Sequence, residues 1–230
     1  MVTTVHDCSP LRIHYAVPMA GSSGTGAVTR VEQKERTRRA ILDAALVLSE
    51  HGGLSGLSLR QLAKEVGVVP TAFYRHFASI DELGLALVEE SIESLRAMIR
   101  DVRQGNPAFA EIIERSVTVL AEHVTTHRGH FAFLTRERYS GPPIVRAAVI
   151  RQLELFEREL AMDLARFPAP HWSNEDFQVL ANLIVGAMVN TVVDLLEAGD
   201  GEQGRLRERA EKQLRMVVVG ALRWRSDWQD

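Results

Sequence analysis

Apolar residues recur at helical spacing from about residue 30 almost to the end of the chain. Ile41, Ala45 and Leu48 form the first such stripe, which predicts a helix over residues 31–51 that ends at a pair of glycines. No segment shows the alternating pattern of a strand. Longer helical segments are predicted, with Gly and Pro residues between them, over residues 79–104, 107–128, 130–139, 143–166, 174–198 and 203–226. The pattern therefore predicts an all-α fold.

The segment 58–77 has the pattern of two short helices separated by a glycine turn. Ser58 and Gln61 have the spacing of a capping box, which predicts that a helix begins there. Gly67 ends that helix, because glycine readily adopts the left-handed conformation of a helix C-terminus. Pro70 fits the first turn of the next helix, where no backbone N–H is required. This arrangement predicts a helix-turn-helix, whose second helix lies in the DNA major groove; an ordinary helical hairpin is the alternative.

Polar side chains that can bond to DNA gather at the second helix and at the start of the first. Thr71 can offer its hydroxyl to a base edge or a phosphate and its methyl group to a thymine. Ser58, at a helix N-terminus, can present its hydroxyl and nearby backbone N–H groups to a phosphate. For the arginines a solvated basic face is the alternative, and Arg39 fits either interpretation. The predicted DNA contacts are Arg36, Arg38, Ser58, Arg60, Pro70, Thr71, Ala72, Tyr74, Arg75 and His76.

The charge distribution agrees with DNA binding, although the formal net charge is only −3. Residues 30–80 carry eight Lys and Arg against five Asp and Glu, whereas residues 81–230 carry 18 against 24. Positive charge thus collects around the helix-turn-helix, where phosphates would be attracted. Cys8 is the single cysteine, so no disulfide can form within the chain, and a reducing cytoplasm is the expected compartment.

Two segments outside the helix-turn-helix allow more than one structural interpretation. The apolar window 179–198 is interrupted by Asn182, Asn190 and Asp194, which favours a buried helix over a membrane span. Residues 1–29 show no helical or strand period, and they are predicted to be a disordered tail or the result of a start codon placed too early. No signal peptide is expected there.

The run 34–90 resembles the DNA-binding domain of TetR-family transcriptional regulators. The matching elements are TRRAILDAALVLSEHG, LSLRQLAKEVGV, PTAFYRHF and DELGLALVEE. The resemblance implies a three-helix DNA-binding domain over residues 30–90, joined by a fourth helix to a larger helical domain over residues 91–230 that binds a ligand and dimerises. Tyr74 and His76 match positions that usually reach phosphate oxygens. Ile80 stands where most of the wider family has Lys, so one phosphate contact is expected to be missing.

Three further segments are similar to one branch of that family, the acyl-CoA-responsive repressors of unsaturated fatty-acid synthesis and desaturase genes. They are PTAFYRHFASIDELGLALV, then FLTRERYSG with RAAV behind it, and LRMVVVGALRWR. The likeness implies a cytoplasmic, homodimeric repressor that binds a palindromic operator and responds to long-chain acyl-CoA, without a cofactor or catalysis. The alternatives are a multidrug-type regulator that senses another apolar compound and, from a different class, a helical lipid-binding or acyl-transferring enzyme.

The segment 130–141 combines aromatic and arginine side chains that would suit an acyl chain and the phosphates of coenzyme A. Phe131 and Phe133 lie two residues apart, so on one helix only one of them can face a pocket while the other faces the core. Arg138 lies two helical turns after Phe131 on the same face, and it is therefore favoured over Arg136 for the phosphate. Core aromatics with surface ion pairs are the alternative. The predicted ligand contacts are Phe131, Phe133, Leu134, Arg136, Arg138, Phe156 and Met188.

A group of histidines and the apolar faces of the last two helices lead to two further predictions. His123 and His127 have a spacing that can bind zinc, and His130 lies nearby, but histidines at a helix C-terminus are more often a solvent-exposed end, so no metal is expected. The last two helices carry wide apolar faces, which suit a helical bundle formed with a second copy of the chain. The predicted dimer contacts are Ile184, Met188, Leu214, Val217, Ala221 and Trp224.

Overall fold

Every regular element in the described part of the chain is helical, as the apolar pattern predicts. The computed structural model describes residues 29–103, 109–166, 171–199 and 201–226, so the predicted tail lies outside the described residues except for Thr29. The elements are α1 (Arg30–Gly52), the short 3-10 turn η1 (Leu54–Gly56), α2 (Leu59–Val66), α3 (Pro70–Phe73), α4 (Ile80–Arg103), α5 (Phe109–Thr126), α6 (Arg128–Ser140), α7 (Pro143–Leu164), α8 (Asn174–Glu197) and α9 (Gln203–Ala221).

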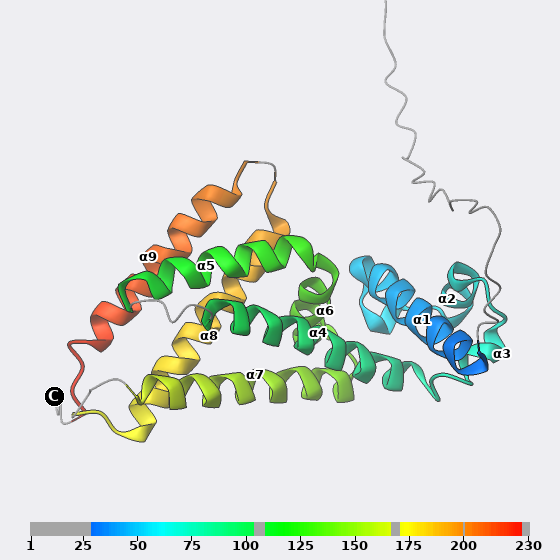
Figure 1. Ribbon diagram of the computed structural model, residues 1–230, viewed down its shortest axis with the longest axis horizontal. Helices are drawn as coiled ribbons and strands as arrows, with labels where there is room; N and C mark the ends of the chain where they lie inside the picture. Colours follow the sequence, from blue (N-terminus) through cyan, green and yellow to red (C-terminus); the bar gives the residue numbers. More distant parts are fainter. Residues whose placement is uncertain (1–28, 104–108, 167–170, 200, 227–230) are drawn as a thin grey trace, which may run out of the picture.

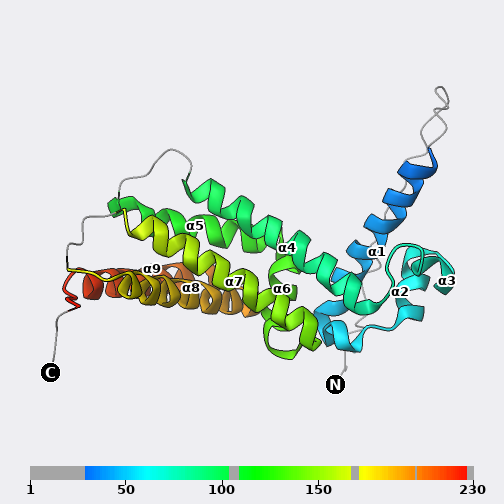
Figure 2. The same ribbon diagram turned by 90° about the horizontal axis from the view of Figure 1, so that it is seen from below.

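The molecule is elongated, with a small unit at one end and a larger helical bundle at the other (Figure 1). The small unit consists of α1, α2 and α3, and α4 runs from it into the bundle formed with α5 to α9. Figure 2 shows α8 and α9 side by side along one edge of that bundle, away from the small unit. The small helical unit and the larger helical domain expected from the sequence are thus both present, with α4 between them.

The helix-turn-helix forms, although two local predictions need correction. Gly67 ends α2 at φ +73°, and the N–H of Val68 donates to the carbonyl of Ala63 over 2.9 Å. Ser58 precedes α2 as its N-cap, but its side chain makes no capping hydrogen bond, so the predicted capping box is absent. The second helix is also shorter than expected. Only Pro70–Phe73 is α-helical, and the chain continues through a turn to Phe77.

Two further capping boxes, which were not predicted from the sequence, begin other helices. Thr29 and Glu32 form one at the start of α1, and Ser173 and Asp176 form another at the start of α8. Asp176 also accepts hydrogen bonds from Ser226, Ser173 and Trp224, which hold the pKa of its carboxyl far below the usual range. This network fastens the last described residues to the beginning of α8.

One hydrophobic core connects the small unit to the bundle. Leu54, from the turn after α1, is 1% exposed and packs where α4 and α7 meet. Gly84 on α4 leaves room for it, because a Cβ there would lie 2.3 Å from Leu54 Cδ2 and 2.7 Å from Val145 Cγ2. The core cluster contains Ile41, Leu42, Ala45, Leu54, Leu62, Phe73, Phe77, Leu83, Leu87, Val88, Ile92, Phe133, Leu134, Val145, Val149 and Phe156. It therefore crosses the boundary near residue 90 that the sequence predicts.

The most apolar helix packs within the bundle, although only 22% of its most apolar window is buried, less than the sequence predicts. By length and composition alone, α8 could cross a membrane, since its mean hydropathy reaches 1.9 over an 18-residue window. It packs against α7 on one side and α9 on the other, with α5 and α6 also in contact. Leu180, Ala181, Val192 and Leu195 on this helix are buried.

Candidate DNA-binding face and ligand cavity

The one-turn helix α3 divides its side chains between the core and the solvent. Phe73 and Phe77 are 2% and 1% exposed, with ring centroids 5.7 Å apart, and they fix the turn to the core. Thr71 and Arg75 are exposed, and Tyr74 is 61% exposed with its ring edge against Phe73. The side chains predicted to meet DNA therefore lie together on the outside of a turn anchored by two phenylalanines.

Other predicted DNA contacts surround this turn. Ser58 and Arg60 at the start of α2 are exposed, as are Pro70 at the start of α3 and Arg36 on α1, whereas Ala72 is half-buried. Which of these side chains contact a phosphate or a base stays a prediction.

Arg38 makes contacts within the protein, and its predicted contact with DNA stays a prediction. Its side chain is half-buried, and Nη1 donates a hydrogen bond to the backbone carbonyl of His76 over 3.0 Å. The guanidinium carbon lies 4.3 Å from the centroid of the Phe77 ring. Arg38 is thus engaged within the protein rather than extended from its surface. Arg39 is also engaged, in ion pairs with Asp43 at 3.3 Å and Glu90 at 2.7 Å.

His76 presents a largely neutral ring at neutral pH. Partial burial lowers the pKa of its imidazole, and the positive charges of Lys34, Arg38 and Arg75 lower it further. Its Nδ1 atom is buried and has no hydrogen-bond partner. A phosphate contact from His76 would therefore be that of an uncharged donor unless the phosphate itself raised the pKa.

The bundle encloses an apolar cavity of about 690 Å³. Side chains from α4, α5, α6, α7, α8 and α9 line it, most of them aliphatic, with Ser116 and Thr135 among the few polar ones. Five of the predicted ligand residues are in the lining, namely Phe131, Leu134, Arg138, Phe156 and Met188. The cavity size lies within the range of about 300–1,000 Å³ that is usual for small-molecule sites.

The two aromatic residues and the two arginines of α6 diverge as their spacing predicts. Phe131 lines the cavity, whereas Phe133 is 3% exposed in the core shared with the small unit. Arg138 lines the cavity, whereas the stem of Arg136 lies against Gly53, at the end of α1. Phe133 and Arg136 are therefore corrected: their positions on α6 turn them toward the small unit rather than toward a ligand.

Charged groups border the cavity in two places. At the ends of α4 and α7, Arg103 forms an ion pair with Asp163, and Arg166 lies 3.7 Å from the same carboxylate. On α6, Arg138 is half-buried, and its guanidinium carbon lies 5.4 Å from the Tyr139 ring centroid. In the described part of the chain no carboxylate forms an ion pair with Arg138. Its positive charge is thus available to an anionic ligand group.

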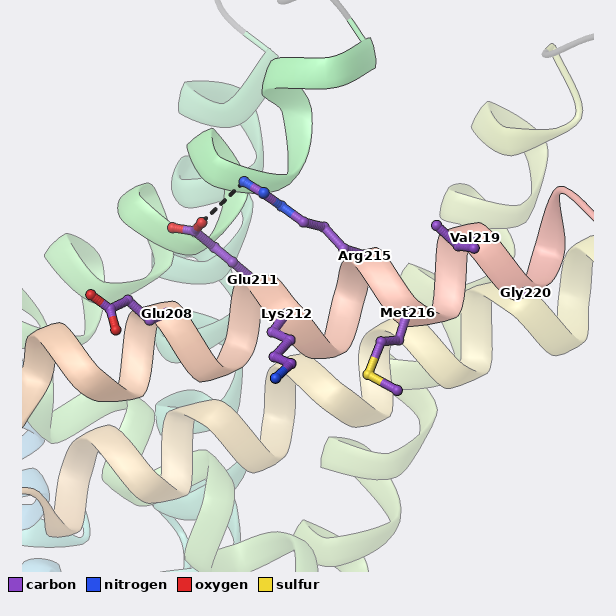
Figure 3. Close-up of a pocket in the computed structure, with 7 residues that line it drawn as sticks. All are labelled: Glu208, Glu211, Lys212, Arg215, Met216, Val219 and Gly220. Atoms are coloured by element: carbon purple, nitrogen blue, oxygen red, sulfur yellow. Dashed lines mark hydrogen bonds and ion pairs between the residues drawn. The ribbon is translucent and has the colours of Figure 1, made fainter.

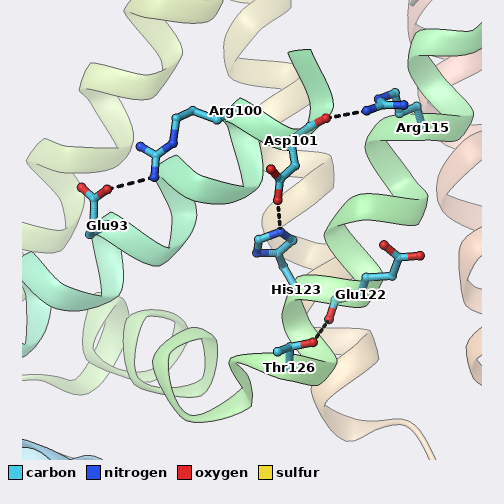
Figure 4. Close-up of polar contacts among 7 residues, drawn as sticks. All are labelled: Glu93, Arg100, Asp101, Arg115, Glu122, His123 and Thr126. Atoms are coloured by element: carbon cyan, nitrogen blue, oxygen red, sulfur yellow. Dashed lines mark hydrogen bonds and ion pairs between the residues drawn. The ribbon is translucent and has the colours of Figure 1, made fainter. Parts of the chain in front are cut away.

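The three histidines near the α5–α6 corner contact one another, and His123 also contacts α4. His123 Nε2 lies 2.8 Å from Asp101 Oδ2, and Arg115 donates to the Asp101 carbonyl over 2.7 Å, which ties α5 to the end of α4 (Figure 4). Neighbouring rings of His123, His127 and His130 have centroids 5.6 and 6.3 Å apart. Within the described residues no cluster of three or more potential metal ligands occurs.

Two family profiles match this chain. Residues 41–87 match the bacterial regulatory proteins of the tetR family, and residues 109–220 match the tetracyclin repressor-like C-terminal domain. Together these matches cover more than half of the sequence, and they fall on the helix-turn-helix unit and on the bundle with the cavity. The chain belongs to the TetR family. It is accordingly a ligand-responsive transcriptional regulator.

Solved structures share the fold of this TetR-family regulator at low sequence identity. A transcriptional regulator from Rhodococcus sp. Rha1 is 19% identical, with a TM-score of 0.61 over 81% of this chain and 96% of that one. A regulator from Aquifex aeolicus VF5 is 17% identical, with a TM-score of 0.61 over 79% and 99%. The multidrug binding protein EbrR, complexed with imidazole, is 21% identical, with a TM-score of 0.53 over 76% and 93%.

TetR-family regulators act as dimers. Three of the six residues predicted for the contact lie inside the protomer, and for Val217, Ala221 and Trp224 a role in the contact stays a prediction. Ile184 and Met188 line the cavity, and Leu214 is 5% exposed in a cluster with Val117 and Ala210, so these three side chains face into their own protomer. Val217 and Ala221 are half-buried. Trp224 is 45% exposed, and its Nε1 donates to Asp176 over 2.7 Å.

The outer sides of α8 and α9 carry a different set of apolar side chains. Val179 and Leu183 on α8 are each 53% exposed, and Met216 and Val219 on α9 are 68% and 61% exposed. Figure 3 shows a groove along α9 in which Met216 and Val219 lie beside charged residues, with Arg215 paired to Glu211 at 3.3 Å. We define these four exposed apolar residues as the α8–α9 outer face.

Proposed function

We propose that this TetR-family regulator is a repressor of fatty-acid or lipid genes, desaturase genes among them, and that long-chain acyl-CoA controls its hold on a palindromic operator. The observation that supports this most is Arg138, a cation without a carboxylate partner in the described residues, at the border of an apolar cavity. An apolar chain would fill the cavity, and the coenzyme A phosphates would meet the guanidinium group. The sequence likeness to acyl-CoA-responsive repressors points to the same ligand.

Control by such a ligand requires unequal affinity for two conformations. An acyl-CoA shifts operator binding only if it binds the DNA-competent and DNA-incompetent arrangements of the dimer with different affinities. The cavity is bounded by α4 and α6, both of which also contact the small unit. A ligand that moves these helices would therefore change the distance between the two small units of a dimer.

Titration of operator binding tests the ligand. Saturated and unsaturated long-chain acyl-CoA should change operator affinity at micromolar concentration, whereas free coenzyme A should not, because each buried methylene contributes about 0.8 kcal/mol. Arg138→Ala should weaken the response about tenfold or more, since a hydrogen bond to a charged group contributes about 1.5–3 kcal/mol. Unliganded DNA binding should change little. Arg151→Ala, an exposed arginine on α7, is the matched control.

A multidrug-type regulator is the alternative, and the cavity gives a reason to test it. Its lining is mostly aliphatic, and its volume of about 690 Å³ also suits a neutral drug-sized compound. If acyl-CoA leaves operator binding unchanged while an uncharged apolar compound shifts it equally in the wild type and in Arg138→Ala, the lipid-sensing proposal is wrong. The enzyme alternative has no support from the family, because TetR-family proteins are DNA-binding regulators. They are typically cytoplasmic, and we propose the same compartment for this protein.

A further inference from the structure

The DNA-reading turn is too short to hold its own shape. The α-helical part, Pro70–Phe73, is a single turn, and an isolated turn is unfavourable because it fixes several backbone dihedral angles for one hydrogen bond. Its direction must therefore come from groups outside it. Phe73 and Phe77 provide two apolar anchors, but both lie on the inner side of the turn.

Arg38 provides a support at the other end of the turn. It reaches from α1 and donates to the carbonyl of His76 over 3.0 Å, next to exposed Arg75. The same guanidinium group lies 4.3 Å from the centroid of the Phe77 ring. A flat guanidinium group can satisfy both contacts at once, with its edge on the carbonyl and its face on the ring.

We propose that Arg38 is a positioning residue for DNA recognition, which sets the orientation of Thr71, Tyr74 and Arg75 and makes no phosphate contact itself. Its Nη1 donates within the protein, the face of the guanidinium group lies on the Phe77 ring, and the side chain is half-buried, which holds the group against the turn. A displaced turn would still carry the positive charge that attracts DNA. It would, however, present its polar groups at the wrong depth for base edges, which are read only at close range.

The test separates orientation from charge. An operator selected from a random duplex library by the wild-type protein is compared with random duplex DNA over a series of salt concentrations. Arg38→Met keeps the aliphatic stem and removes the guanidinium group. We expect the preference for operator over random DNA to fall about tenfold, which corresponds to about 1.4 kcal/mol. The salt dependence of random DNA binding should stay that of the wild type.

A phosphate contact would give a different result. Each neutralised phosphate contributes about 0.9 to the slope of log affinity against log salt. If Arg38→Met weakens both DNAs equally and lowers this slope by about one, Arg38 binds phosphate and the proposal is overturned. Lys34→Met, which removes an exposed charge from the same helix at a position outside the predicted DNA contacts, measures the effect of charge alone.

Arg38→Lys keeps the test decisive even if the methionine variant unfolds. Lysine retains the charge but has no flat face to stack on Phe77 while it donates to the carbonyl. We expect its operator preference to fall as well, with a melting temperature close to that of the wild type. Wild-type preference in Arg38→Lys would show that only the charge matters, and it would overturn the proposal.

Discussion

His130 lies where α1, α4 and α6 meet, and its ionisation state matters to that junction. Its Nδ1 is 3.1 Å from Ser91 Oγ, and its Nε2 is 3.8 Å from the Glu90 carboxylate. Burial lowers the pKa of His130, and the adjacent His127 lowers it further, while Asp43 opposes the shift. Burial also raises the pKa of Glu90, against the effect of its partner Arg39.

The lowered pKa of His130 predicts a loss of stability in mild acid. As the pH falls below the pKa of His130 in the unfolded chain, the unfolded state binds a proton that folded His130 does not yet bind. The free energy of unfolding therefore falls until the pH reaches the lower pKa of His130 in the folded state. One such group changes it by at most about 1.4 kcal/mol per pH unit. Urea unfolding of the wild type and His130→Gln at several pH values between 7.5 and 5 should show a shallower fall in the variant. Parallel curves would contradict the prediction.

The spacing of residues along a helix predicted which side chains point in different directions, but it could not predict which part of the protein each side chain contacts. The two-residue spacing correctly separated Phe131 from Phe133 and Arg138 from Arg136, because it fixes their angle on the helix. Leu214 belonged to a wide apolar face whose inner and outer sides look alike in the sequence. A half-buried arginine such as Arg38 has no distinguishing local signal, because its carbonyl partner lies 38 residues away.

Helix α6 connects the cavity to the DNA-binding unit through its two faces. Leu134 and Arg138 line the cavity, and Glu137 points the other way, where it is 1% exposed and accepts a hydrogen bond from the Leu54 N–H over 2.8 Å. The second carboxylate oxygen of Glu137 is buried without a partner, and burial raises the pKa of this carboxyl. A rotation of α6 would therefore move the contact at Leu54.

Two substitutions separate the hydrogen bond of Glu137 from its charge. Glu137→Ala leaves the buried Leu54 N–H without a partner, which should lower the free energy of unfolding by about 1–3 kcal/mol. Glu137→Gln keeps an acceptor carbonyl and removes the charge, so its stability at pH 7 should equal or exceed that of the wild type. Urea unfolding measures both. An alanine variant as stable as the glutamine variant would show that this hydrogen bond contributes nothing.

Most helices were predictable because each has a stripe of apolar residues and a breaker at its end. The exceptions have physical causes. The end of α3 is set by tertiary anchoring of Phe73 and Phe77, which no local pattern encodes. The capping box at Ser58 failed although its spacing is correct, since a matching sequence permits the hydrogen bonds without requiring them.

At the scale of the whole molecule, the α8–α9 outer face predicts the dimer contact. Met216→Glu combined with Val219→Glu should give monomers in sedimentation velocity with normal helix content, because charges buried in an apolar contact would lack partners. Operator affinity should fall with dimerisation. Met162→Glu on α7 is the matched control, since Met162 is 63% exposed and Met216 is 68% exposed. A dimeric double variant would place the contact elsewhere.

The core shared between the small unit and the bundle limits how this protein can be rebuilt. A fragment that ends with α4 would lose Phe133, Val145 and Val149, which belong to the same core cluster as the buried side chains of the small unit. Leu54 would then face water at the point where α7 now covers it. The small unit therefore cannot be exchanged between proteins as an independent domain. A chimera that gives it a new sensor should keep α6 and the first half of α7 from this chain, and the exchange should begin after Phe156.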